Sequence, residues 1–243
     1  MPNPTAAMLV IGDEILSGRT RDANMYHLAC ELAKAGIDLQ EVRVVGDDAS
    51  AIADAVNALR SAFDHVFTSG GIGPTHDDIT AESLARAFGV AIDVRDDARA
   101  LLQAYLDRQG NTMNEARLRM ARIPEGAVLI DNPVSIAPGF SLENVHVMAG
   151  VPAIFQAMVA SVLPTLTGGA PVQSATVRIN LPEGEIAGPL GQLAERCPEL
   201  SIGSYPFIQD GKFGANIVIR GTDAQTVKAA AQALRDRFAG SVA

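Results

Sequence analysis

The sequence lacks an excess of basic residues. It has 19 Lys and Arg against 28 Asp and Glu, which gives a formal net charge of −9 at pH 7. Non-specific binding of nucleic acid requires Lys and Arg side chains that neutralise phosphates, so this composition argues against a nucleic-acid partner. Residues before position 170 include 12 basic and 21 acidic ones, whereas those after it include 7 of each. The net negative charge therefore belongs to the N-terminal part.

Cysteine is scarce, and long apolar runs are absent. Cys30 and Cys197 could pair, but two cysteines in 243 residues make no disulfide framework. The N-terminus has no basic segment before its short apolar run, which argues against a signal peptide. Residues 144–177 contain no Asp, Glu, Lys or Arg, but Gly and Pro interrupt them, and a spanning helix needs ~20 continuous apolar residues. We therefore expect a cytoplasmic protein without a membrane partner.

Apolar runs and helical periods alternate in the first 90 residues. Short buried runs indicate strands, and apolar residues spaced three or four apart indicate helices. Asp22 and Ser50 are the expected N-caps of the first two helices, and Gly36 and Gly89 end the first and third. The alternation predicts an α/β fold with a doubly wound parallel sheet. The expected strands are 6–11, 39–45 and 65–68, and the helices lie around 25–32, 52–59 and 80–88.

Further elements follow, and a domain boundary separates them. We expect helices at 96–109 and near 114–121, strands at 127–130 and 145–148, and a closing helix at 154–163. Residues 164–173 contain two Pro and two Gly, which places the boundary there and gives domains 1–168 and 172–243. The second domain shows a β-α-β-β-α order typical of a small α+β fold, with elements at 176–181, 185–196, 201–205, 215–220 and 224–238.

A glycine-rich loop follows the third expected strand. Residues 66–80, VFTSGGIGPTHDDIT, leave a buried strand, pass three glycines and enter a helix near Thr80. Ligands of open α/β sheets bind at the carboxyl ends of the strands. Glycines let backbone N–H groups approach an anion closely, and the following helix terminus adds partial positive charge. The pattern predicts a phosphate-binding loop, with a tight turn that requires positive φ as the alternative.

The charges around this loop point to a metal ion. No Lys or Arg lies between Arg60 and Arg86, and no Lys follows the glycines as in a Walker A loop. A bound phosphate then needs another positive charge, for which a divalent cation is the obvious candidate. Asp77 and Asp78 follow directly, and one or two carboxylates with phosphate oxygens can hold such a cation. Alternatively, Asp78 or Thr80 caps the helix; His76 is expected to be exposed.

Three other motifs allow more than one interpretation. Residues 12–18, GDEILSG, and Asn24 follow another strand end, so Asp13 either faces the same crevice or belongs to an acidic surface turn. Residues 132–140, NPVSIAPGF, form a rigid loop that is either a site wall or a structural turn. Residues 188–191, GPLG, match the G-x-x-G of KH domains, but no Lys or Arg flanks them and chance is favoured. Met113 and Met120 are expected in the core.

Taken together, these motifs resemble a known family. GDEIL-SG (12–18), TSGGIGPTHDDIT (68–80), PEGA (124–127), APGF (137–140) and AGVP (149–152) resemble the molybdopterin-binding domain of molybdenum-cofactor biosynthesis proteins. The CinA type (competence/damage-inducible protein A) is the most similar. The resemblance covers residues ~6–166, with Ser135 in place of a common Gly and Ala149 in place of a common Pro. The remainder resembles the small KH-like domain of CinA-type proteins, and the amidase domain of full CinA proteins has no counterpart.

The resemblance implies a fold and a chemistry. It implies a three-layer, MogA/MoaB-like α/β fold with a mostly parallel sheet, and a homo-oligomer that is a dimer or trimer. It also implies Mg-, Mn- or Co-dependent hydrolysis of a nucleotide diphosphate such as ADP-ribose. Molybdopterin binding or adenylylation, with a pterin partner, and a non-catalytic nucleotide-binding module are the alternatives. The implied catalytic residues are Asp13, Asp77 and Asp78, the last two also holding the metal; the implied phosphate or substrate contacts are Ser69, Gly70, Gly71, Gly73, Pro74, Thr75, Thr80, Asn24, Asn132, Pro138 and Gly139.

Overall fold

The first strand shows why the sheet is covered on both faces. In the computed structural model, which describes residues 2–135, 137–209 and 211–242, the chain forms two compact units, Met1–Gly169 and Ala170–Ala243. Within β1 (Thr5–Ile11), alternate side chains enter two separate apolar clusters. Successive side chains of a strand point to opposite faces. A strand that is apolar on both faces must therefore lie inside a layered sheet.

The sheet of the first unit has six strands in the order β2-β1-β3-β8-β7-β6. The first four run parallel, and β7 runs antiparallel to both of its neighbours. The expectation of a mostly parallel α/β sheet is therefore confirmed. Besides β1, its strands are β2 (Asp38–Val45), β3 (His65–Ser69), β8 (Val145–Met148), β7 (Gly139–Leu142) and β6 (Val128–Ile130).

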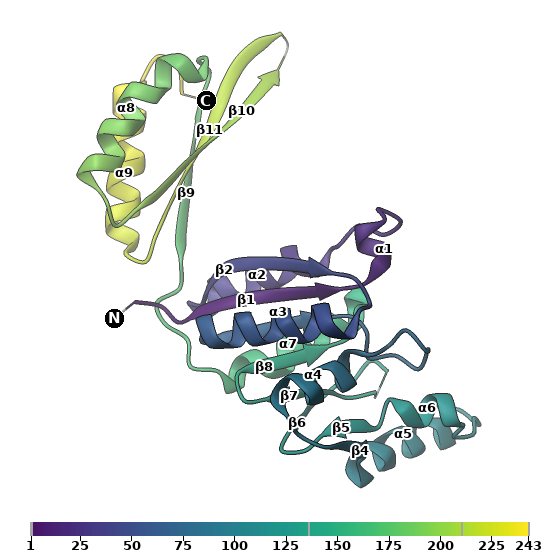
Figure 1. The fold of residues 1–243 in the computed structure, drawn as a ribbon. Helices are drawn as coiled ribbons and strands as arrows, with labels where there is room; N and C mark the ends of the chain where they lie inside the picture. The colour runs from purple at the N-terminus through teal and green to yellow at the C-terminus, as the bar shows by residue number, and fades with distance from the viewer. Residues whose placement is uncertain (1, 136, 210, 243) are drawn as a thin grey trace. The chain divides into compact units, whose positions relative to one another are not determined.

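Helices cover both faces and make the three layers (Figure 1). On one face, α3 (Ala49–Ala62) and α4 (Thr80–Phe88) bury side chains such as Ile52 and Leu84 against the sheet. On the other, α2 (Asn24–Ala35) and α7 (Pro152–Val162) bury Leu28, Phe155 and their neighbours. The one-turn α1 (Asp13–Leu16) follows β1, and η1 (Leu163–Thr165) follows α7.

The structure contains several short elements that the sequence does not predict. The strands β4 (Ile92–Val94) and β5 (Arg122–Pro124) form an antiparallel pair beside α5 (Asp96–Arg108) and α6 (Glu115–Arg119). Three residues are too few to show a period of two. The strand β7 was interpreted as loop because Pro138 precedes it and Gly139 begins it. Met113 and Met120 pack against the core of this face, as expected.

Three expected helix N-caps differ from the structure. The α3 cap is Asp48, whose side chain accepts hydrogen bonds from the N–H groups of Ser50 and Ala51, and not Ser50 itself. No side chain caps α4, so the alternative that Asp78 or Thr80 serves as its cap is wrong. For α2, the N-cap position is Ala23 and not Asp22, although the Asp22 side chain accepts a hydrogen bond from the N–H of Met25. Gly36 and Gly89 end α2 and α4 in the left-handed conformation.

The second unit is a small α+β domain, as expected. Its antiparallel sheet has the order β10-β11-β9, and side chains from α8 and α9 pack with one of its faces in a cluster that includes Ile186, Ile217 and Leu234. Residues 188–191 lie inside α8, so they form no KH-type loop. The elements are β9 (Gln173–Ile179), α8 (Glu183–Arg196), β10 (Ser201–Gln209), β11 (Lys212–Gly221) and α9 (Ala224–Arg237).

The uncharged stretch from Asn144 to Val177 folds as strand β8, helix α7, a linker and the start of β9. No helix in the described part of the chain combines the length and the apolar character needed to cross a bilayer. Cys30 and Cys197 are both free thiols.

Candidate functional site

The loop after β3 has a backbone that requires glycine. Gly70 and Gly71 have φ angles of 109° and 68°. A Cβ atom on Gly70 would lie 2.2 Å from the carbonyl oxygen of Ile11, and one on Gly71 would lie 2.1 Å from Oγ1 of Thr80. The expected tight turn with positive φ is thus present, and both glycines pack closely against neighbouring protein atoms. The loop can fold this way only without side chains at these two positions.

Hydrogen bonds hold both ends of this loop and leave its middle available. The N–H of Gly70 donates to the carbonyl of Met148 (3.1 Å), and the N–H of Thr80 donates to that of Gly71 (2.9 Å). The Thr80 hydroxyl donates to the carbonyl of Gly70 (3.0 Å). No described residue accepts a hydrogen bond from the backbone N–H groups of residues 71–73. These three consecutive donors precede the N-terminus of α4, a combination that suits an anion.

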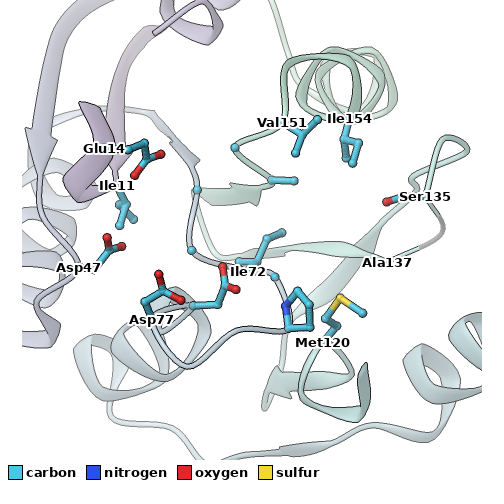
Figure 2. Close-up of a pocket in the computed structure, with 18 of the residues that line it drawn as sticks. Ile11, Glu14, Asp47, Ile72, Asp77, Met120, Ser135, Ala137, Val151 and Ile154 are labelled. Atoms are coloured by element: carbon cyan, nitrogen blue, oxygen red, sulfur yellow. The ribbon is translucent and has the colours of Figure 1, made fainter. Parts of the chain in front are cut away.

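The loop forms one wall of a cavity of about 630 Å³. Small-molecule sites commonly occupy ~300–1,000 Å³, so a nucleotide fits this volume. Figure 2 shows Glu14, Asp47 and Asp77 around one side of the opening, with Val151 and Ile154 across from them. The predicted residues that line the cavity are Gly70, Gly71, Gly73, Pro74, Asp77, Asp78 and Asn132.

The two aspartates of the loop have different surroundings. One carboxylate oxygen of Asp78 accepts from the N–H (2.8 Å) and the hydroxyl (2.5 Å) of Thr75, and it packs against Gly73. Asp78 is therefore partly committed to shaping the loop. Asp77 is exposed, and its position beside the Thr75 hydroxyl, followed by its own backbone N–H, lowers its pKa, so it is ionised at neutral pH. His76 beside it is exposed, as expected.

Asn24 and Ser69 lie just beneath the cavity. Asn24 begins α2 and is 3% exposed. Its side-chain amide donates to the hydroxyl of Ser69 (2.7 Å) and to the carbonyl of Gly150 (2.8 Å). The two residues line a smaller pocket that shares walls with the main cavity. Asn24 thus joins three segments that the sequence separates widely: the start of α2, the end of β3 and the loop after β8.

Asn132 organises the opposite wall. Its amide donates to the Ser135 hydroxyl (2.7 Å) and the Ala137 carbonyl (2.8 Å), and its carbonyl accepts from the N–H groups of Val134 and Ser135 (3.1 Å each). All of its polar atoms therefore have partners, and its role is to position this loop. Ser135 and Ala149, the two positions that depart from the family pattern, both line the cavity.

Besides Asn24 and Ser69, which line the smaller pocket, five predicted residues do not line the main cavity. Asp13 is exposed, and a Cβ on Gly46 would lie 2.4 Å from its carboxylate, so it faces the end of β2 and not the ligand space. Thr80 is buried under the loop, and Thr75 lies behind Asp78. Pro138 lines a small pocket of about 20 Å³ behind the loop. Gly139 packs its backbone against the carbonyl of Val147.

The structure adds polar cavity residues that sequence reasoning did not select. Glu14 and Asp47 follow β1 and β2 at the same edge of the sheet, so the strand-end rule that selected Asp13 applied to them equally. Arg19 brings a cation to the wall from the segment after α1. Arg19 lies far from the glycine loop in sequence, so it was not predicted to lie near the loop. The cavity therefore has a positive charge in its wall, although no Lys or Arg lies between Arg60 and Arg86.

The carboxylates in the cavity wall can supply only some of the ligands that a divalent metal ion needs. Among the described residues, no group of three or more His, Cys, Asp and Glu is close enough to hold a metal ion. Asp77 and Asp78 are hard oxygen donors on the cavity wall, as Mg²⁺ prefers. They fit a cation that takes its remaining ligands from water and from phosphate oxygens of the bound molecule, and they do not fit a permanent protein-only metal site.

Two family models match the chain, and the boundary between them in sequence coincides with the boundary between the two compact units. Residues 7–168 match the family described as "Probable molybdopterin binding domain". Residues 171–243 match the middle domain of FAD synthase. The small C-terminal domain therefore matches a family named after FAD synthase, whereas a KH-like domain was expected there.

Curated relatives match all or part of the chain. A "Probable FAD synthase" of Caenorhabditis elegans is 32% identical over 98% of this chain and 50% of its own length. A "CinA-like protein" of Citrifermentans bemidjiense is 40% identical over 67% of this chain and 40% of its own length. The chain thus spans about half the length, or less, of these curated relatives.

A solved structure has the same fold. The crystal structure of the CinA protein of Thermoplasma acidophilum, described as having unknown function, matches with a TM-score of 0.62 and 32% identity, over 67% of this chain and 97% of that one. Together with the glycine loop, the six-stranded sheet and the family match over residues 7–168, this places the chain in the molybdopterin-binding domain family, and its first domain is of the CinA-like kind.

Proposed function

We propose that the first domain binds a nucleotide diphosphate and hydrolyses its phosphoanhydride bond with the help of a divalent cation. One observation carries the proposal: residues 71–73, whose backbone N–H groups donate to no described residue, line the same cavity as Asp77 and Asp78. The N–H groups suit phosphate oxygens, and the carboxylates suit a cation that bridges to them. ADP-ribose is the proposed representative substrate.

In this reaction water attacks one phosphorus atom and the bridging P–O bond breaks. ADP-ribose and water then give AMP and ribose 5-phosphate. The proton of the attacking water passes to a carboxylate of the wall, for which Glu14 and Asp47 are available beside Asp77. A bound cation would polarise the phosphorus centre and offset negative charge. Arg19 adds a second positive charge at the wall.

The names of relatives support a nucleotide substrate. FAD contains the same kind of phosphoanhydride bond, between its AMP and flavin mononucleotide halves. Relatives named "Probable FAD synthase" share both domains of this chain. FAD therefore belongs beside ADP-ribose among the proposed substrates, while the synthase named in those relatives is a protein of which this chain spans half the length.

The test measures AMP release by chromatography from ADP-ribose and from FAD, with Mg²⁺, Mn²⁺, Co²⁺ or a chelator. We expect metal-dependent release, and a loss of at least about tenfold in kcat/KM for Asp77→Ala, because an exposed metal-binding carboxylate is removed. Asp54→Ala is the matched control, since Asp54 is also exposed but lies on α3 outside the cavity lining. Equal rates for the two variants would refute the assigned role of Asp77.

The family match favours one alternative. Binding of molybdopterin, with adenylyl transfer to it, is the second proposal, because the description of the matched family names that ligand. Adenylyl transfer would release pyrophosphate from ATP only when a pterin is present. If nucleotides raise the melting temperature without any turnover, the chain is instead a non-catalytic nucleotide-binding module. The expected dimer or trimer stays a prediction that sedimentation can test.

A further inference from the structure

The orientation of the Asn24 side chain is fixed by its neighbours. The carbonyl oxygen of Gly150 can only accept a hydrogen bond, so the atom 2.8 Å from it must be the amide nitrogen of Asn24. The same nitrogen donates to the Ser69 hydroxyl at 2.7 Å. Both N–H donors of the amide are thus used, and a flip of the amide would place two oxygens against each other. The side chain therefore presents its oxygen Oδ1 in one direction only.

That oxygen is buried and has no hydrogen-bond partner among the described residues. Buried polar atoms of native proteins are nearly always hydrogen-bonded, and each exception requires an explanation. An acceptor left without a donor is unfavourable, and the cost is avoided when water or a ligand supplies an N–H or O–H group. The hydrogen-bonding capacity of Oδ1 of Asn24 is therefore not used by any described residue.

A side pocket of about 60 Å³ lies at this position, and its wall includes Glu14, Thr20, Asp22, Asn24, Ser69 and Gly150. Glu14, Thr20 and Gly150 line the main cavity too, so the two spaces adjoin. Figure 2 shows Glu14 beside the main cavity. Ser69 directly precedes the glycine loop, so a group in the side pocket lies next to the proposed phosphate position.

We infer that the side pocket receives a ribose hydroxyl of the bound nucleotide, which donates a hydrogen bond to Oδ1 of Asn24. The inference deepens the proposed function and rests on it, since the sugar is joined to the phosphate that the glycine loop holds. It makes Asn24 the residue that distinguishes ribonucleotides from deoxyribonucleotides. Carboxylate or amide oxygens aimed at a sugar hydroxyl are a common means of ribose recognition.

Other groups fit the side pocket less well. Its volume corresponds to about four or five water-sized groups at ~10–15 Å³ each, which is small for a purine or flavin ring. A phosphate would meet the carboxylates of Glu14 and Asp22, against which Arg21 is the one cation in the wall. A neutral hydroxyl is small enough for the pocket, and it can supply the donor that Oδ1 of Asn24 has from no described residue.

The experiment compares ligands on the unmodified chain of 243 residues. Titration calorimetry measures the binding of AMP, 2′-deoxy-AMP and 3′-deoxy-AMP, which needs no turnover. We expect one of the deoxy compounds to bind about tenfold more weakly than AMP, because Oδ1 is then left without its donor. Equal affinities for all three would overturn the inference while leaving the proposed function intact. Failure of AMP and ADP-ribose to bind at all would refute the proposed function.

A variant at Asn24 then tests whether this residue distinguishes AMP from its deoxy analogues. In Asn24→Ala the ratio between AMP and the weaker deoxy compound should fall toward one, whatever the absolute affinity becomes. Asn111→Ala, which alters an exposed asparagine away from both pockets, should keep the wild-type ratio. Circular dichroism checks that each variant is folded; if Asn24→Ala is not, Asn24→Ser supplies the same ratio. A folded Asn24 variant that still discriminates tenfold would show that another residue reads the sugar.

Discussion

At the scale of single residues, Gly71 and Gly110 offer a controlled comparison. Both have a φ angle of 68°, but a Cβ atom on Gly71 would strike Oγ1 of Thr80, whereas one on Gly110 would meet nothing within 4 Å. Alanine at either position thus bears the same backbone strain, and only Gly71→Ala adds a clash. The difference between the two variants isolates the close approach within the glycine loop.

We predict that Gly71→Ala abolishes AMP binding and lowers the free energy of unfolding by about 1–3 kcal/mol more than Gly110→Ala. Urea denaturation and calorimetry measure the two quantities. Gly110→Ala should bind AMP with wild-type affinity, since Gly110 follows α5 outside the cavity lining. Normal AMP binding by Gly71→Ala would contradict the assignment of this loop to phosphate.

His146 gives a residue-scale prediction about pH. It lies in β8 with its ring centroid 5.0 Å from that of Phe67, and burial, followed by the nearby His65, lowers its pKa from 6.5 to about 4. Between these two pKa values, His146 is therefore neutral in the folded state and protonated in the unfolded state. The stabilisation is complete above pH 6.5 and is lost as the pH falls toward 4, by up to about 3 kcal/mol in the free energy of unfolding.

Urea midpoints between pH 7.5 and 4 test this prediction. The decrease should become much smaller in His146→Gln, which cannot take up a proton. His76→Gln should keep the wild-type curve, since His76 is almost fully exposed. Loss of stability only below pH 4 would point instead to carboxylates such as Asp97, whose pKa is lowered to about 2 by its hydrogen bond with Arg95.

Residue types and strand order explain which site residues could be found from sequence. The glycines of the loop and Asp77 and Asp78 form one short segment, so spacing alone selected them. Asp47 and Arg19 come from segments that only the packing of β1 and β2 brings to the same edge. Asp13 was selected over Glu14 although both follow β1; the direction of each side chain depends on the turn of α1, which the sequence does not reveal.

At the scale of elements, the N-cap of α3 in the structure differs from the residue expected from the sequence. Ser50 and Asp48 both have side chains suited to an N-cap, and the residue pattern does not distinguish them. In the structure Asp48 accepts the hydrogen bonds from the first turn, and this lowers its pKa. Asp48→Ala should lower the melting temperature by about 2–4 °C, and Ser50→Ala by clearly less. A larger effect of Ser50→Ala in thermal denaturation would restore Ser50 as the cap.

The strands also differ in how well the sequence predicts them. Long, fully apolar strands such as β1 were predicted nearly to the residue, because burial on both faces leaves a continuous apolar run. The antiparallel β7 was not, although Phe140 is buried in it. Its four residues begin with Gly139, which is needed because a Cβ there would lie 2.3 Å from the carbonyl of Val147. A glycine required by packing looks, in sequence, like one required by a turn.

At the scale of the whole molecule, the two units have separate interiors. The apolar clusters of the first contain only residues between Ala6 and Leu166, and that of the second only residues between Ala175 and Val242. All described residues that line the main cavity lie between Ile11 and Ile154. The formal charges divide in the same way, with the net negative charge on the first unit.

The fragment 1–169 should therefore fold alone and bind AMP within about twofold of the affinity of the full chain. Each unit buries its own apolar side chains, so neither needs the other to fold. Thermal denaturation by circular dichroism and calorimetry with AMP measure the two properties. A folded fragment that binds AMP more than tenfold more weakly would show that residues 170–243 contribute to the ligand site, and would move the search for substrate specificity to the second domain. Retained affinity would assign phosphate binding and sugar discrimination to the first domain alone.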